Sequence, residues 1–348
     1  MPWNVLRQEP TKMKTKQTVR LVFNADDFGM SVPANRAILE AYGCGLMKSA
    51  SLMVVHPFAE QAAVAASAAS AESTSATFKE SGPSSPLGLG LHFCLTSGLA
   101  VAPASEVPLL VDGDGRLKWG FLGLRALLRS VRRADAIRQI ETEFQAQMER
   151  FDHIVTKAPN CLVDHLDSHQ HIHVFPEIFP FLAREAARRN LVLRIPHERI
   201  GSLCRFVQGS PVFHAKGVVK KMILDHYLKT SRKLMVQGNT FPCGYPGSAP
   251  LYFGIVDSGR MVRSTVLEIV RILPKLARRT NSWHAEVNLH PWCPESDAVP
   301  DAASPADRVF AMSAQREREL EVVTKHYPEI QGEMARCGIM PDLFASFL

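Results

Sequence analysis

The densest set of side chains able to do chemistry lies between Asp167 and His173, in the run DSHQHIH. An aspartate and three histidines alternate there, so in an extended strand they would all point to one face. We expect such a strand over residues 161–173. Imidazole and carboxylate groups on one surface are what a divalent metal ion requires. A surface strand with a chance run of histidines is the alternative, so partners elsewhere in the chain must decide.

Polar residues also end two earlier predicted strands. The run NADDFG places the adjacent carboxylates Asp26 and Asp27 before a turn glycine. In GLGLH, His92 shares a strand face with Gly88 and Gly90, whose missing side chains would leave room for a ligand. Each feature by itself has a simpler explanation. Paired aspartates before glycine are often a turn with a helix cap, and a single histidine at a strand end is often a hydrogen-bonded core residue.

A fourth polar strand end is EVNLHP, in which Glu286, Asn288 and His290 alternate with apolar neighbours. By itself His290, which precedes a proline, is equally well explained as a loop residue. In parallel α/β folds, however, active sites lie at the C-terminal ends of several strands. A carboxylate and two histidines from three strands would form an open metal site with positions left for water. The joint occurrence of four polar strand ends therefore favours a site.

Strand-like and helix-like segments alternate along most of the chain. This is typical of a parallel sheet with outer helices, either doubly wound or closed into a barrel. The expected strands cover residues 19–25, 49–55, 87–95, 161–173, 191–195 and 285–289. The expected helices follow the N-cap Ser31, follow Pro57, and cover residues 136–148, 176–189, 218–234, 261–276 and 313–325. The stretch 71–86, rich in Ser, Ala, Gly and Pro, predicts a loop.

The composition limits the class of protein. The chain has 348 residues, of which 46% are hydrophobic and 21% charged, as in soluble globular proteins. No apolar run approaches the ~20 residues that span a bilayer, and the first residues lack the apolar core of a signal peptide. Seven scattered cysteines without a CxxC pair predict reduced thiols in a cytoplasmic protein. We expect an extension over 1–18 and one domain over 19–348, with a loop insertion at 71–86 and variable helices at 204–280.

The formal net charge is +6, and basic residues cluster around 125–138, 216–233 and 271–279. Solvated helix faces explain such clusters most simply. The segment 216–233 also contains Val218, Val219, Met222, Ile223 and Tyr227, which is compatible with a basic amphipathic helix in peripheral contact with an anionic membrane. No nucleic-acid partner is expected, because no DNA-reading motif or regular aromatic interleaving is present. A homodimer is the assembly that we expect.

In their order along the chain, NADDFG, SLMV, GLGLH and DHLDSHQHIH resemble the motifs of the YdjC-type carbohydrate deacetylases. That family includes diacetylchitobiose deacetylases and the deacetylases linked to hopanoid synthesis. The resemblance runs from about Val19 to about Pro291. It implies a variant (β/α) barrel and metal-dependent hydrolysis of the N-acetyl group of an acetylated amino sugar. It also implies one magnesium ion, Mg²⁺, whereas two imidazoles and a carboxylate alone suit zinc, Zn²⁺.

The resemblance also implies a role for each matching residue. The metal ligands would be Asp27, His92 and His169. Asp26 would be the general base and His290 the general acid, although Trp292 stands here where the family's His-Pro-Gly motif has glycine. From their positions, Asp167 and His171 are expected to orient the ligands. Arg194 is expected to contact the sugar or to pair with a carboxylate.

Two other classes of function fit these residue types. Metal-dependent phosphoesterases also place Asp and His ligands at barrel strand ends, commonly around two metal ions. The sequence offers no second complete ligand set. A catalytically inactive sugar-binding module is the other alternative. The Asp26–Asp27 pair argues against it, because a binding module has no need for a spare base.

Overall fold

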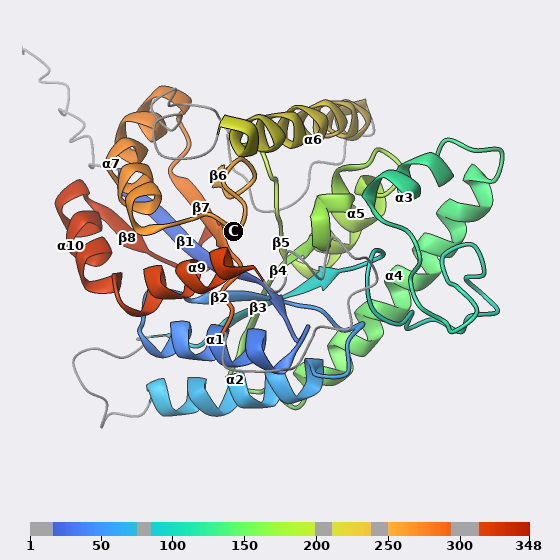
Figure 1. Ribbon diagram of the computed structural model, residues 1–348, viewed down its shortest axis with the longest axis horizontal. Helices are drawn as coiled ribbons and strands as arrows, with labels where there is room; N and C mark the ends of the chain where they lie inside the picture. Colours follow the sequence, from blue (N-terminus) through green and yellow to red (C-terminus); the bar gives the residue numbers. More distant parts are fainter. Residues whose placement is uncertain (1–16, 75–84, 199–210, 238–249, 294–312) are drawn as a thin grey trace, which may run out of the picture.

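The computed structural model describes residues 17–74, 85–198, 211–237, 250–293 and 313–348. Seven strands form one path in the order β5-β4-β3-β2-β1-β7-β6, and β8 pairs with the start of β1. The strands are β1 (Val19–Phe28), β2 (Ser49–Leu52), β3 (Gly88–Phe93), β4 (Leu162–Ser168), β5 (Val192–Leu193), β6 (Leu251–Phe253), β7 (His284–Leu289) and β8 (Ile339–Pro341). Every pairing between them is parallel. The sheet curls into a half-barrel with helices around it (Figure 1), which confirms the predicted α/β architecture.

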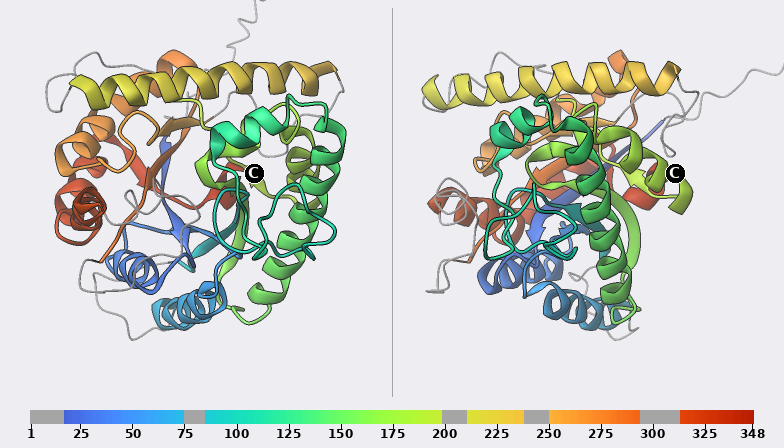
Figure 2. Two further views of the ribbon diagram at one scale, coloured as in Figure 1. Left: turned by 45° about the vertical axis from the view of Figure 1, so that its right-hand side comes forward. Right: turned by 90° about the vertical axis from the view of Figure 1, so that its right-hand side faces the viewer.

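The helices follow the strands along the chain. They are α1 (Val32–Gly43), α2 (Ala59–Thr74), α3 (Phe121–Leu127), α4 (Arg133–Val155), α5 (Phe179–Arg189), α6 (Pro211–Gln237), α7 (Arg263–Thr280), α9 (Ala314–Thr324) and α10 (Tyr327–Cys337), with the short 3-10 helices η1 (His169–Val174) and η3 (Phe344–Phe347). As predicted, α1 begins at the cap Ser31, whose hydroxyl accepts a hydrogen bond from the backbone N–H of Ala34. Figure 2 shows α6 lying across one side of the molecule, next to α3 and α5. No helix in the described ranges has the length and apolar character needed to cross a membrane.

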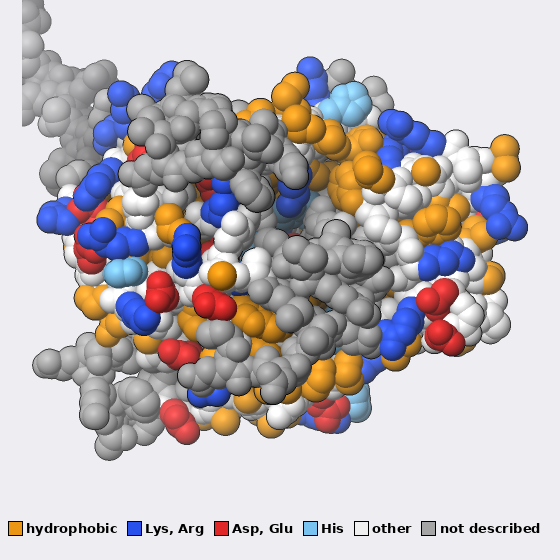
Figure 3. All heavy atoms as spheres, viewed as in Figure 1, with side chains coloured by type: hydrophobic (Ala, Val, Ile, Leu, Met, Phe, Trp, Pro, Cys, Tyr) orange, Lys and Arg blue, Asp and Glu red, His pale blue; other side chains and the backbone are white. Residues whose placement is uncertain are grey.

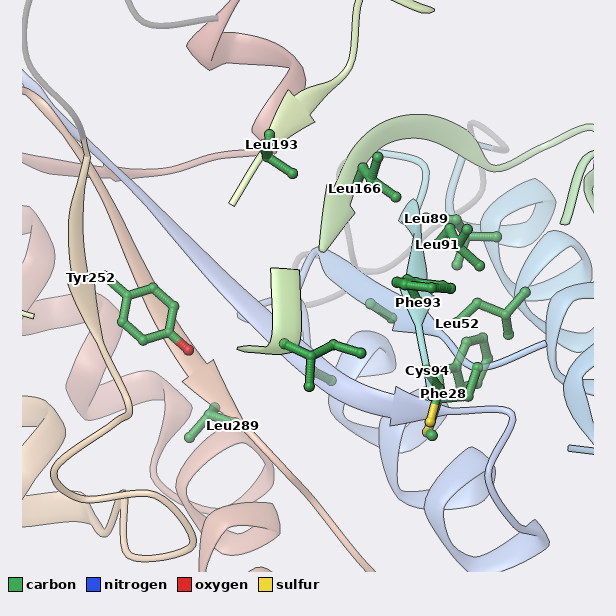
Figure 4. Close-up of a cluster of buried hydrophobic side chains, with 14 of the residues drawn as sticks. Phe28, Leu52, Leu89, Leu91, Phe93, Cys94, Leu166, Leu193, Tyr252 and Leu289 are labelled. Carbon is green, nitrogen blue, oxygen red and sulfur yellow. The ribbon is translucent and has the colours of Figure 1, made fainter. Parts of the chain in front are cut away.

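The hydrophobic core lies between the sheet and its helices. Leu89, Leu91 and Phe93 of β3 point to this side together with Leu166 of β4 (Figure 4). The ring of Phe93 packs edge-on against that of Phe144 in α4, with 5.2 Å between their centroids. Because side chains alternate along a strand, the residues between them point to the inside of the half-barrel. Near the strand ends these inward positions carry polar groups such as His92, whereas Val22, Val192, Phe344 and Phe347 form a small apolar cluster.

The two glycines of β3 make room for β4 and not for a ligand, so that prediction was wrong. A Cβ atom at Gly90 would lie 2.3 Å from the ring of His165, and one at Gly88 would lie 2.8 Å from Oδ2 of Asp164. Nδ1 of His165 lies 2.7 Å from Oδ1 of Asp164, and its Nε2 lies 3.0 Å from the hydroxyl of Ser51. Alternation along β3 predicts which face of the sheet each glycine lies on. The pairing with β4 decides that the side chains of His165 and Asp164 fill the space beside these glycines.

The histidine segment also differs from the prediction. β4 ends at Ser168, and η1 begins at His169. Gln170 and His171 adopt left-handed backbone conformations, with φ of 56° and 57°. The predicted strand is therefore wrong from His169 onward, and the three histidines do not share a face. Consecutive non-glycine residues in this region are rare, and they concentrate at functional sites where the surroundings impose them.

The remaining differences concern boundaries and short elements. β1 continues through both aspartates to Phe28, and α5 begins at Phe179 rather than at residue 176. The predicted loop 71–86 is helical as far as Thr74, while residues 75–84 lie outside the described residues. Most of the predicted extension 1–18 and residues 204–210 of the variable region also lie outside them. The short strands β6 and β8 and the helix α10 were not predicted.

Candidate metal centre and active site

Four strand ends bring the predicted site residues together. One ligand atom from each of Asp27, His92 and His169 lies within 4.8 Å of the others, and all three residues are buried. They come from β1, from β3 and from the first residue after β4. β7, which pairs with β1 on its other side, places Asn288 opposite Asn24 in the same region. The C-terminal edge of the half-barrel therefore holds the site.

A local break in β1 lets two adjacent carboxylates face the same site. On a regular strand Asp26 and Asp27 would point to opposite faces. Asp27 instead has a φ of 67°, and the register of β1 against β2 shifts between Ala25 and Phe28. As a result, carboxylate oxygens of Asp26 and Asp27 lie 3.9 and 3.8 Å from Nε2 of His92. The strained backbone at Asp27 is what turns both acids inward.

The chemistry of this group fits a divalent metal ion. Both oxygens of Asp27 and the Nε2 atoms of His92 and His169 are buried and have no hydrogen-bond partner among the described residues. Buried polar atoms are normally satisfied, and an exception calls for an explanation such as an ion. One carboxylate and two imidazoles suit Zn²⁺ by donor type, and carboxylate ligands also suit Mg²⁺. Asp27, His92 and His169 are therefore the residues that could hold the metal.

Asp167 orients His92. Its Oδ1 lies 2.6 Å from Nδ1 of His92, so the imidazole can donate from Nδ1 and leave Nε2 directed at Asp27. Burial lowers the pKa of His92, but the carboxylates of Asp167, Asp26 and Asp27 outweigh burial and raise this pKa to about 9. The metal-free protein therefore holds His92 protonated near neutral pH, and a metal ion must displace that proton.

Arg194, which follows β5, connects three carboxylates in the interior. Its NH1 lies 2.9 Å from Oδ1 of Asp26 and contacts Asp167, and its NH2 lies 2.7 Å from Oε1 of Glu286. Arg194 is fully buried, so of its two predicted roles the structure has the pairing with carboxylates. Burial raises the pKa of Glu286, Arg194 lowers it, and repulsion from Asp26 and Asp167 raises it further, to about 8 in total.

The carboxylate of Asp26 is held from several sides. Oδ1 accepts a hydrogen bond from Nδ2 of Asn24 at 3.0 Å, and Oδ2 accepts one from Nδ2 of Asn288 at 2.8 Å. Together with Arg194, these donors fix the position of the carboxylate beside Asp27. Nε2 of His290 lies 3.8 Å from Oδ2 of Asp26. The two residues expected to exchange protons with a substrate are therefore neighbours.

Helix α9 contributes two residues that the sequence did not reveal. Glu319 accepts a hydrogen bond from the backbone N–H of His290 at 2.6 Å, and Nε of Arg316 donates to the carbonyl of His290 at 2.7 Å. NH2 of Arg316 also lies 3.2 Å from Oδ2 of Asp27. The only local signal is an Arg and a Glu three residues apart, which is common on exposed helices. Trp292, which stands where the family motif has glycine, lies 5.3 Å from the Arg316 guanidinium.

His171 and His173 lie away from the metal ligands. Nε2 of His171 lies 3.5 Å from the hydroxyl of Tyr252, and the charges of Lys220 and Arg194 add to burial in lowering its pKa. Nδ1 of His173 lies 2.6 Å from the hydroxyl of Ser168. His171 was expected to orient the ligands because it would share a strand face with His169; the left-handed turn removes that shared face, and the ring of His171 contacts Tyr252 and His173.

The fold and this cluster define a half-barrel protein with a candidate metal centre at its strand ends. The chain belongs to the YdjC-like protein family, whose family model matches residues 20–328. Chitooligosaccharide deacetylases of Salmonella paratyphi B and Salmonella typhi are 34% identical to it over 180 residues, and one of Salmonella schwarzengrund is 33% identical. The match covers 52% of this chain and 60% of the length of these relatives.

The fold is shared with a solved structure of much lower sequence identity. The crystal structure of a putative cellobiose-phosphate cleavage protein of Enterococcus faecalis matches with a TM-score of 0.59 and 18% identity. The match covers 94% of this chain and 98% of the other. At this identity the likeness concerns the fold alone, because one fold hosts many functions.

Replacement of Arg194 by methionine should destabilise the protein strongly. Three buried carboxylates would lose their cation, which costs about 3–5 kcal/mol in the free energy of unfolding. Urea denaturation of the purified variant measures this loss. Arg263→Met is the matched control, because its ion pair with Glu329 is exposed and contributes at most about 1 kcal/mol. Equal effects of the two substitutions would contradict a central role for Arg194.

Metal affinity should rise with pH. Because the pKa of His92 is raised to about 9 and a metal ion needs the neutral imidazole, affinity should increase up to about tenfold per pH unit between about pH 7 and pH 9. Calorimetric titration with Mg²⁺ or Zn²⁺ at several pH values measures this slope. The carboxylate of Asp167 contributes most to raising the pKa of His92. In Asp167→Asn this pKa should be lower, so the metal affinity should level off at a lower pH. An affinity independent of pH in the unmodified protein would argue against His92 as a ligand.

Proposed function

We propose that the protein is a metal-dependent hydrolase that removes the N-acetyl group from an acetylated amino sugar and releases acetate. The observation that carries the proposal is the buried Asp27–His92–His169 group with a second, anchored carboxylate, Asp26, beside it. Family membership and the deacetylase relatives agree with this chemistry. A chitooligosaccharide or a lipid-linked glycan is the proposed substrate class.

We propose one divalent ion as the cofactor. Magnesium is preferred on the family resemblance, and zinc is the alternative on donor type. When bound, such an ion polarises the acetyl carbonyl and lowers the pKa of a water molecule. Arg316, beside Asp27, places a further positive charge at this end of the site.

The protein's own residues supply the proton transfers. Asp26, held by Asn24, Asn288 and Arg194, is positioned to take a proton from the attacking water as general base. His290 is positioned next to Asp26 to donate a proton to the departing sugar nitrogen. Glu319 accepts a hydrogen bond from the backbone N–H of His290. This bond holds the segment after β7 in place, and with it the distance between His290 and Asp26.

A phosphoesterase with two metal ions is a weaker alternative. Among the described residues, the second group that could hold a metal is Asp26, His92 and Asp167, and it shares His92 with the first. Asp167 is also paired with Arg194. Two ions would therefore compete for one imidazole and for a carboxylate that already has a cation. The arrangement favours a single ion. The anchored base at Asp26 likewise distinguishes the proposal from an inactive sugar-binding module.

Acetate release from a panel of chitooligosaccharides and lipid-linked amino sugars, with and without added metal, tests the proposed function. Asp26→Asn should keep its metal affinity but turn over at least about 100-fold more slowly, the usual scale for loss of a general base. Asp27→Ala, His92→Ala and His169→Ala should abolish metal-dependent release while the proteins stay folded. Full activity in any of these variants would remove that residue from its role. Phosphate release without acetate release would favour the phosphoesterase.

We also propose that α6 makes peripheral contact with an anionic membrane. This helix exposes Val219, Met222 and Ile223, and Figure 3 shows hydrophobic side chains gathered over it toward the top of the view. If the substrate is lipid-linked, co-sedimentation with anionic vesicles at low salt is expected. Replacement of Met222 and Ile223 by Ser should reduce it. Absence of binding by the unmodified protein would exclude this contact.

A further inference from the structure

The inner face of α6 places one lysine toward the active site. Leu224, Leu228 and Ser231 on this face are buried, and the hydroxyl of Ser231 donates a hydrogen bond to the carbonyl of Val174 at 2.8 Å. Lys220 lies four residues before Leu224, so it belongs to the same face. In a helix packed on a protein core, an apolar residue is usual at such a position. A half-buried lysine there calls for an explanation.

Close packing holds this part of α6 in place. A Cβ atom at Gly217 would lie only 2.2 Å from the carbonyl oxygen of Val256, so the helix lies directly against the segment that follows β6. The carboxylate of Glu198 binds the backbone N–H groups of Ile255 and Val256 at 2.8 and 2.9 Å and fixes that segment. The position of Lys220, one turn after Gly217, is therefore set by backbone packing and not by its own side chain.

The ammonium group of Lys220 lies within electrostatic reach of the site. Burial lowers its pKa, and the carboxylates of Asp26, Glu198 and Asp27 act in the opposite direction. The same charge helps to lower the pKa of His171. Yet in the described part of the chain Lys220 has no hydrogen bond and no ion pair. Its three donors therefore have no partner among the described residues, and the charges of Asp26, Asp27 and Glu198 act on it.

Neighbouring lysines of α6 differ in this respect. Lys221 forms an ion pair with Asp225, which also lies 3.0 Å from Nδ1 of His197. Lys229 is exposed to solvent. Of these three lysines, Lys220 is the one on the inner face of α6 that forms no hydrogen bond or ion pair with the described residues.

We propose that Lys220 is a substrate-binding residue that donates a hydrogen bond to a neutral oxygen of the amino sugar beside its acetamido group. This inference rests on the proposed function. A hydroxyl or carbonyl oxygen is the favoured acceptor, because Asp26, Asp27 and Glu198 around the ammonium would repel an anionic substituent. A single charged hydrogen bond from α6 would help to orient the sugar ring with its amide toward Asp26 and His290.

Kinetics of Lys220→Met with a neutral N-acetylglucosamine dimer test the proposal. We expect KM to rise at least about tenfold with kcat changed less than about threefold, the pattern for loss of a binding contact to a charged donor. Lys220→Arg should recover part of the loss, and Lys229→Met should match the unmodified protein. Thermal unfolding of each variant establishes that it is folded.

Three kinetic results would overturn the proposal. One is an unchanged KM in Lys220→Met. Another is a fall in kcat with a shifted pH profile and an unchanged KM, which would mean that Lys220 acts on the protonation of Asp26. The third is a defect confined to phosphorylated or carboxylated sugars, which would mean that an anion is the acceptor.

Calorimetric binding of the neutral dimer to Asp26→Asn, with and without Lys220→Met, separates the proposed role of Lys220 from the proposed deacetylase function. Absence of acetate release by the unmodified enzyme contradicts the proposed function, whereas equal binding by both variants contradicts only the role of Lys220.

Discussion

The buried guanidinium of Arg194 is the interaction on which the half-barrel and its site both depend. β5 and β7 are separated by four strands in the sheet order, yet Arg194 after β5 pairs with Glu286 on β7. Its guanidinium also lies 5.8 Å from the ring of Tyr252 on β6, the strand at the other edge of the sheet. An unpaired buried charge is costly. The curl of the sheet brings Arg194 to the acids on β1, β4 and β7, and these ion pairs in turn stabilise the curled sheet.

The same cation organises the candidate centre. It contacts Asp26, the proposed base, and Asp167, which in turn orients His92. The inner surface of the half-barrel therefore holds a chain of charges in which each acid has a defined partner. Asp27 is the exception, because neither of its oxygens has a hydrogen bond among the described residues, although Arg316, His169 and His92 lie nearby. This imbalance is what an additional cation would correct.

Residues outside the sheet complete the site from two directions. α9 fixes His290 and brings Arg316 to Asp27, while α6 carries Lys220 toward the carboxylates. Both helices belong to the C-terminal half of the chain, whereas Asp26, Asp27, His92 and His169 belong to the N-terminal half. In the proposed mechanism the N-terminal half provides the candidate metal ligands and the general base, whereas the general acid His290 and the helices that surround the site come from the C-terminal half.

The sequence by itself determined the order of strands and helices and the polar residue types near the C-terminal ends of the strands, because alternation along a strand and the parallel arrangement are local or general properties. The choice of Asp27, His92 and His169 as candidate ligands came from the resemblance of their motifs to those of the YdjC-type family. Only the tertiary structure decided what depends on contacts between distant segments. It directed His171 to Tyr252 through a left-handed turn, filled the space above Gly90 with His165, and paired Arg194 with carboxylates of three strands. It also revealed Arg316, Glu319 and Lys220, whose helices look like ordinary charged helices in sequence. The direction of a helix face is set by packing across the whole fold, and no local pattern contains that information.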